Sequence, residues 1–172
     1  CTVTDANGAA TTVSATITQP VAPLNASTAA QVNAGCFGDN SGSATVNVSG
    51  GTPAYSYSWN TVPAQTSATA TGLVAGNYTC TITDAHGCGT SASAAIMQPT
   101  AALNVSIGGQ NDVLCFGNST GSATANAIGG TTPYSFAWSN GQSTATAAGL
   151  AAGDHTCTVT DANGCTAIAI AT

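Results

Sequence analysis

The stretch Gly76–Cys88, GNYTCTITDAHGC, decides the fold that this sequence predicts. Tyr78, Cys80 and Ile82 fall on one face and threonines alternate with them on the other, a period of two that is typical of a half-buried β-strand. The Asp-Ala-His-Gly that follows is turn chemistry, because Asp accepts backbone N–H groups and Gly supplies a positive φ. Thr90–Met97 alternates again, so the stretch predicts a strand, a tight turn and a second strand.

This unit occurs three times, which indicates a repeat protein. It returns at 153–165 as GDHTCTVTDANGC and opens the chain at 1–8 as CTVTDANG. The matching positions lie 77 to 79 residues apart, and Gln19-Pro20 and Gln98-Pro99 punctuate the units. We therefore expect a C-terminal hairpin of an upstream repeat at 1–19, a complete repeat at 20–98 and a second repeat at 99–172, with a repeat length of about 78 residues.

The predicted fold class is all-β, with each repeat an immunoglobulin-like β-sandwich. Each full unit holds six or seven short strands separated by turn signals, and the leading strand of the first full unit is expected at 21–30. In the N-terminal piece, the second strand of the hairpin is expected at 11–18. Trp59 lies on the third strand of its unit, and Tyr78 stands two residues before Cys80 after a corner, as in immunoglobulin-like domains. The partner cysteine that such domains carry on the second strand is missing from 43–48.

The composition excludes several classes of function. The chain has no Lys, Arg or Glu and a formal charge of −6, so it cannot neutralise phosphates and we expect no nucleic-acid partner. No apolar run approaches the roughly 20 residues of a membrane span, so we expect no direct membrane insertion. The sequence offers no nucleophile–base set, no carboxylate pair and no phosphate loop, which predicts a non-enzyme without cofactors. For His86 and His155 we favour structural roles, since they occupy different phases of the repeat.

The two full units resemble the SprB repeat. The motifs that carry this resemblance are CFGDNSGSATVNVSGGTPAYSYSWN, GLVAGNYTCTITDAHGC and IMQP in the first unit, and CFGNSTGSATANAIGGTTPYSFAWSNGQ with GLAAGDHTCTVTDANGC in the second. SprB repeats occur in many tandem copies in large surface adhesins and filaments of gliding bacteria. The resemblance implies secretion to the cell surface or a released filament, and a role in adhesion or in filaments.

The seven cysteines recur in phase with the repeat, which favours disulfides in an oxidising compartment over zinc, since there is no CxxC pair. We expect Cys36 to pair with Cys88 and Cys115 to pair with Cys165. Cys80 and Cys157 share a face with core residues, so we expect them to be buried thiols.

Two further kinds of site are open at this point. Asp5, Asp84 and Asp161 each head a hairpin turn, which favours an Asx-turn role; Asp39 and Asp84 are weak calcium candidates. Asn-X-Ser/Thr sequons are candidate glycosylation sites, with O-linked glycan on Thr and Ser as an alternative. The sequon asparagines are Asn25, Asn47, Asn77, Asn104 and Asn118.

The leading hypothesis is a structural or adhesive segment of a secreted, glycosylated tandem-repeat fibre. The alternative is a carbohydrate- or ice-binding extracellular module, motivated by the outward threonines 79, 81 and 83. The expected partners are neighbouring repeats of the same chain, with glycan and lateral self-association in a fibre. Residues 1–19 complete either an upstream repeat of a longer chain, which we favour, or a neighbouring chain by strand addition.

Overall fold

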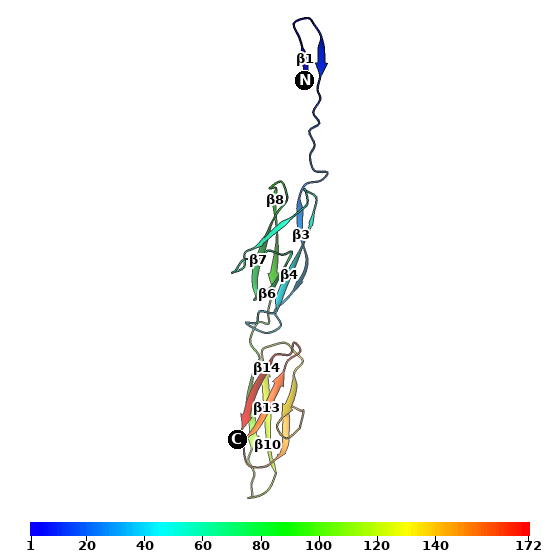
Figure 1. Ribbon diagram of the computed structural model, residues 1–172. Helices are drawn as coiled ribbons and strands as arrows, with labels where there is room; N and C mark the ends of the chain where they lie inside the picture. Colours follow the sequence, from blue (N-terminus) through cyan, green and yellow to red (C-terminus); the bar gives the residue numbers. More distant parts are fainter.

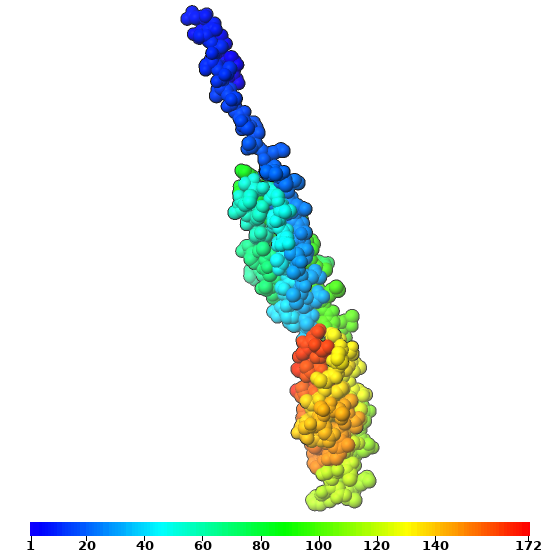
Figure 2. Space-filling view, turned by 90° about the vertical axis from the view of Figure 1, so that its right-hand side faces the viewer, coloured from blue at the N-terminus to red at the C-terminus, as the bar shows by residue number.

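A computed structural model describes residues 1–172, and it confirms the all-β fold class. Fourteen strands form five antiparallel sheets. An N-terminal hairpin and two β-sandwiches follow one another along a single long axis (Figures 1 and 2). No helix in the chain is long and apolar enough to cross a membrane. The repeat length of about 78 residues stays a prediction.

The N-terminal hairpin stands apart from both sandwiches (Figure 1). Its strands β1 (Thr2–Thr4) and β2 (Ala10–Thr12) pair only with each other, with Thr2 opposite Thr12. The strand predicted at 11–18 is therefore only three residues long. The reason is that residues beyond the pair have no sheet to bond with, and the Ile17 side chain is 92% exposed.

The strands β3 to β8 build the first sandwich, which we call repeat 1. One sheet has the order β3-β4-β6, and the other has the order β5-β7-β8. The strands are β3 (Asn25–Val32), β4 (Gly42–Ser49), β5 (Ser56–Trp59), β6 (Thr69–Leu73), β7 (Gly76–Thr83) and β8 (Gly89–Ile96). The leading strand begins at Asn25 rather than at the predicted position 21, because the chain bends at residues 21–22, where Ala22 O accepts the N–H of Gly51 at 2.9 Å.

Repeat 2 has the same plan. Its sheets have the orders β12-β10-β9 and β11-β13-β14. The strands are β9 (Asn104–Asn111), β10 (Gly121–Ile128), β11 (Ser135–Trp138), β12 (Thr146–Leu150), β13 (His155–Thr160) and β14 (Thr166–Ala171). In repeat 1 the edges of the two sheets meet where Thr28 Oγ1 donates to Ser93 O at 2.7 Å.

Each sandwich encloses a thin core around one tryptophan. Trp59 is 1% exposed and donates its indole N–H to Ser67 O at 2.9 Å, while Trp138 donates to Thr144 O at the same distance. Alanines supply much of the remaining core, so the facing sheets hold few large side chains. Such small cores leave each sandwich dependent on its turns and junctions.

A corner bond of the same form recurs in both repeats. Tyr78 Oη donates to Val74 O at 3.1 Å, four residues back, and His155 Nε2 lies 2.9 Å from Ala151 O. His155 thus stands in the position of Tyr78 and makes the equivalent contact. This geometry gives His155 a structural role.

Candidate functional site: the junction between the repeats

The turn between the last two strands of each sandwich is built around one carboxylate. Asp84 Oδ1 accepts the N–H groups of His86 and Cys88, and its Oδ2 accepts that of Thr52, each at 2.9 Å. Because Thr52 belongs to the β4–β5 loop, the Asp84 side chain ties the turn to the loop that connects the two sheets. The Thr52 N–H, and with it those of Cys88 and His86, holds the pKa of Asp84 below its ordinary value despite its burial.

Asp161 holds the matching turn of repeat 2. Its Oδ1 accepts from Asn163 and Cys165, and its Oδ2 accepts from Thr131, again at 2.9 Å. Burial raises the pKa of Asp161, but the N–H donors of Thr131, Cys165 and Asn163 together outweigh burial, so the net pKa is lowered. The turn therefore presents Cys165 in a fixed orientation at the upstream end of the sandwich.

Glycine is required where each turn meets the β4–β5 loop or its equivalent. A Cβ on Gly51, which has a φ of +62°, would lie 2.8 Å from Asp84 Oδ2. At Gly130, with a φ of +59°, the same atom would lie 2.6 Å from Asp161 Oδ2. A larger residue at either position would be strained, both by the positive φ and by the close approach of its Cβ to the carboxylate.

The loop at 33–41 lies at the other, downstream end of repeat 1. Ala34 N donates to Met97 O at 2.9 Å, and Gly38 N donates to the side-chain oxygen of Gln98 at 2.8 Å. Within the loop, Ser41 Oγ accepts from Gly35 N at 3.0 Å. The loop is thus fixed against the segment that leads from repeat 1 into repeat 2, with Cys36 at its outer edge.

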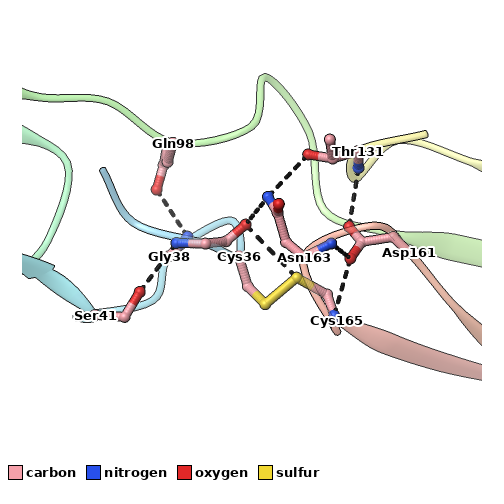
Figure 3. Close-up of a disulfide and its surroundings, with 9 residues drawn as sticks. Cys36, Gly38, Ser41, Gln98, Thr131, Asp161, Asn163 and Cys165 are labelled. Atoms are coloured by element: carbon pink, nitrogen blue, oxygen red, sulfur yellow. Dashed lines mark hydrogen bonds between the residues drawn. A yellow bond between two sulfur atoms is a disulfide. The ribbon is translucent and has the colours of Figure 1, made fainter. Parts of the chain in front are cut away.

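The loop of repeat 1 and the turn of repeat 2 meet and are joined covalently (Figure 3). Cys36 and Cys165 form a disulfide with a Cα–Cα distance of 5.8 Å across a sequence separation of 129 residues. Beside it, Asn163 Nδ2 donates to Gly35 O at 2.7 Å and to Thr131 Oγ1 at 3.1 Å. One bridge and one side-chain amide therefore hold the ends of the two sandwiches together.

This bridge corrects the expected pairs Cys36–Cys88 and Cys115–Cys165. Within one repeat the loop cysteine and the turn cysteine lie at opposite ends of β7, whose eight residues span roughly 23 to 26 Å at about 3.3 Å per residue. A disulfide needs Cα atoms within about 7 Å. Only the turn of the following repeat comes within that distance of Cys36.

The other cysteines are free in the structure and fall into two groups. Cys80 and Cys157 are both 0% exposed and pack in the two cores beside the tryptophans. Burial raises the pKa of both thiols. Cys88 and Cys115 are exposed, at the upstream end of repeat 1 and the downstream end of repeat 2, and Cys1 is exposed in the hairpin.

The weak calcium candidates are not brought together. Asp39 belongs to the loop beside the junction, where its Oδ2 lies 3.9 Å from the position of a Cβ on Gly35, whereas Asp84 lies in the turn at the far end of β7. A hydrogen bond from Ser41 is the main cause that lowers the pKa of Asp39. No group of three or more His, Cys, Asp or Glu side chains is placed to hold a metal.

The five sequon asparagines are all exposed. They lie on strands or strand ends of both repeats and on the loop that contains Cys115. Their side chains are therefore sterically open to a glycan.

A hollow of about 200 Å³ lies at the downstream end of repeat 2, lined by residues that include Gly121, Leu150 and Ala171. The equivalent position in repeat 1 holds a core side chain, because a Cβ on Gly42 would lie 2.6 Å from Ile96 Cγ2. The hollow is thus part of the sandwich interior, and we assign it no ligand.

The comparisons with known proteins agree with the repeat plan. The model of the SprB repeat matches residues 28–64 and 108–143, so the resemblance seen in the sequence is confirmed in these two regions. No curated protein matches the chain.

A solved structure to which this chain is similar is the tetra-tandem repeat in the extending region of a large adhesion protein. The two are 16% identical over 99% of this chain and 54% of that one, with a TM-score of 0.28. This chain thus spans about half the length of that chain.

Proposed function

We propose that this chain, with its two regions that match the SprB repeat, is a structural and adhesive segment of a secreted tandem-repeat fibre on the cell surface. The observation that carries the proposal is the covalent junction between the repeats, where Cys36 and Cys165 join the ends of successive sandwiches. A fibre must resist separation of its units along its axis, and a bond at each junction meets that need. The compartment would be oxidising, as outside the cell.

The junction also alters how tension passes through the chain. Pulling on residues 1 and 172 places the load on the bridge, because the 129-residue segment between its ends is closed into a loop. Most of repeat 1 and of repeat 2 lies in that loop. The strands inside the loop, β4 to β13, are therefore shielded from the tension, whereas β3 and β14 lie outside it.

We extend the proposal to the division of the chain. Residues 1–19 are the C-terminal hairpin of an upstream repeat, 20–98 form a complete repeat and 99–172 form the second. The support is that the β1–β2 hairpin carries the Asp turn, with Asp5 Oδ1 accepting from Asn7 and Ala9 at 2.9 Å as the turns of both sandwiches do.

Glycan and lateral contacts complete the proposal. A surface with 3% charged residues has few ionic groups to keep neighbouring fibres apart, and covalent glycan on the exposed sequons would do so. Lateral self-association is supported by Ile168 and Ile170, which are 62% and 54% exposed on β14 where β8 carries Ser91 and Ser93.

Surface labelling tests the location and the role. Antibodies raised against the folded chain should decorate filaments on intact, unpermeabilised cells in immunogold electron microscopy, and their Fab fragments should reduce attachment to a solid surface. Fab fragments from a non-immune serum serve as the matched control. Label that appears only after permeabilisation would refute the proposal. For glycan, the native segment should weigh more than the 16.5 kDa of the unmodified chain.

A further inference from the structure

We propose that Cys88 and Cys115 are the two halves of a further junction of the same kind, and that each forms a disulfide with another SprB-type repeat. Cys115 stands in the loop position of Cys36, and Cys88 stands in the turn position of Cys165. The equivalent pair is bonded in this structure, while these two thiols are exposed and free. The proposal deepens the fibre function and rests on it.

The loop that contains Cys115 has the form of a docking loop with nothing against it. Its Phe116 is fully exposed and its Leu114 is 91% exposed. Phe37, the equivalent of Phe116 in the docked loop of repeat 1, is only 49% exposed. A further repeat that follows repeat 2 in the way that repeat 2 follows repeat 1 would lie against this apolar loop.

The turn that contains Cys88 is already shaped to receive such a loop. Asp84 fixes the Cys88 N–H as Asp161 fixes that of Cys165, at the same 2.9 Å. His86 takes the position of Asn163, and its Nδ1 lies 2.9 Å from Thr52 Oγ1. Its other ring nitrogen is left to donate to an incoming carbonyl, as Asn163 donates to Gly35 O.

The occupant must be another repeat, since the β7–β8 turn that contains Cys88 and the β9–β10 loop that contains Cys115 lie at opposite ends of the paired sandwiches (Figure 1). Cys88 lines a hollow of about 330 Å³ together with Gly51, Asp84 and residues 19–24. The β1–β2 hairpin does not cover this thiol, which is exposed. The loop and the turn are complementary in the one junction that the structure shows, so Cys115 should bond to a turn and Cys88 to a loop.

The bond forms by thiol–disulfide exchange with a small disulfide oxidant such as oxidised glutathione. The Cys88 thiolate attacks the oxidant and releases one thiolate, giving a mixed disulfide. The Cys115 thiolate of the other repeat then attacks the Cys88 sulfur and releases the second thiolate. Two cysteine thiols are oxidised to one disulfide, the oxidant is reduced to two thiols, and the two protons are passed on to the released thiolates.

The first test uses the full 172-residue chain with Cys1→Ser, which removes the third exposed thiol. In a glutathione redox buffer this chain should form a ladder of disulfide-linked multimers, and digestion with a non-tryptic protease should give the Cys88–Cys115 peptide. Adding either Cys88→Ser or Cys115→Ser should leave monomers, whereas a mixture of those two variants should form a dimer. Circular dichroism should show that both remain folded.

Monomers alone, or multimers joined Cys88–Cys88 or Cys115–Cys115, would overturn the proposal. The second test maps native protein whose free thiols are blocked with N-ethylmaleimide at isolation. Cys88 should be linked to a Cys-Phe-Gly loop peptide, and its recovery as the blocked thiol would also overturn the proposal. Surface labelling does not depend on these thiols, so failure of the inference is distinguishable from failure of the fibre function.

Discussion

Reducing the Cys36–Cys165 bridge should greatly lengthen the chain under tension. With the bridge closed, a pull on the two ends can extend only residues 1–35 and 166–172, because residues 36 and 165 stay 5.8 Å apart at their Cα atoms. With the bridge open, the 129-residue loop adds roughly 430 to 460 Å at 3.3 to 3.6 Å per residue. The extra length is a direct measure of the loop that the bridge closes.

Optical tweezers with handles on peptide tags at the two termini can measure this length. The oxidised chain should give a short extension, and dithiothreitol or Cys36→Ser should add the full step. Cys115→Ser is the matched control, since it makes the same substitution in the equivalent loop without touching the bridge. Full extension of the oxidised wild-type chain, or the same step in the control, would show that Cys36 and Cys165 do not carry the load.

Four further predictions concern stability and association. Asp161→Ala should lower the urea midpoint of unfolding at pH 7. Because the folded pKa of Asp161 is lowered, the stabilisation by its carboxylate is present above the ordinary pKa of about 4 and is lost as pH falls through the lower folded pKa, so the difference between the midpoints of variant and wild type should shrink as pH falls below about 4. Gly51→Ala should cost about 1 to 2 kcal/mol or more in thermal melts, from its φ of +62° and the close approach of its added Cβ to a carboxylate. Cys157→Ser should destabilise repeat 2 by about 1 to 3 kcal/mol in urea unfolding followed by tryptophan fluorescence, because a hydroxyl would replace a 0% exposed thiol, whereas Cys115→Ser should change nothing there. Ile168→Ser should reduce sideways association in sedimentation, and equal sedimentation of both chains would argue against that surface.

The strands could be predicted from sequence because their signal is local. The alternation of Tyr78, Cys80 and Ile82 with threonines sets one face of β7 inward, and the structure has Cys80 and Ile82 at 0% exposed. The Asp turn could be predicted for the same reason, since its side chain bonds groups two and four residues on. The hydrogen bond from the Thr52 N–H to Asp84 joins residues that are 32 apart in sequence, and no local pattern indicates it.

The junction could not be predicted by pairing cysteines within a unit. The sequence shows which cysteines occupy equivalent loop and turn positions in the two repeats. A loop cysteine can pair with the turn cysteine of its own repeat or with that of the next repeat. The length of β7 separates these cases, because its eight residues place the loop of Cys36 and the turn of Cys88 at opposite ends of one sandwich. A prediction that had followed the direction of each strand would have put the partner of Cys36 in the next repeat.

The spacing of the bridge has a consequence for a longer series of repeats. The loop closed by Cys36 and Cys165 contains Cys115, so a bridge from Cys115 to a following repeat would begin inside it. Successive loops would then overlap rather than lie end to end. If the Cys36–Cys165 bridge opened, the bridges at Cys88 and Cys115 would take the load, and the chain between these two residues could add at most 27 residues, roughly 90 to 97 Å. That step is shorter than the step expected from the isolated chain, where no second bridge can take the load. Stepwise reduction of a stretched native fibre should therefore give the shorter step if the junctions are all bridged, and the longer step if Cys115 is free.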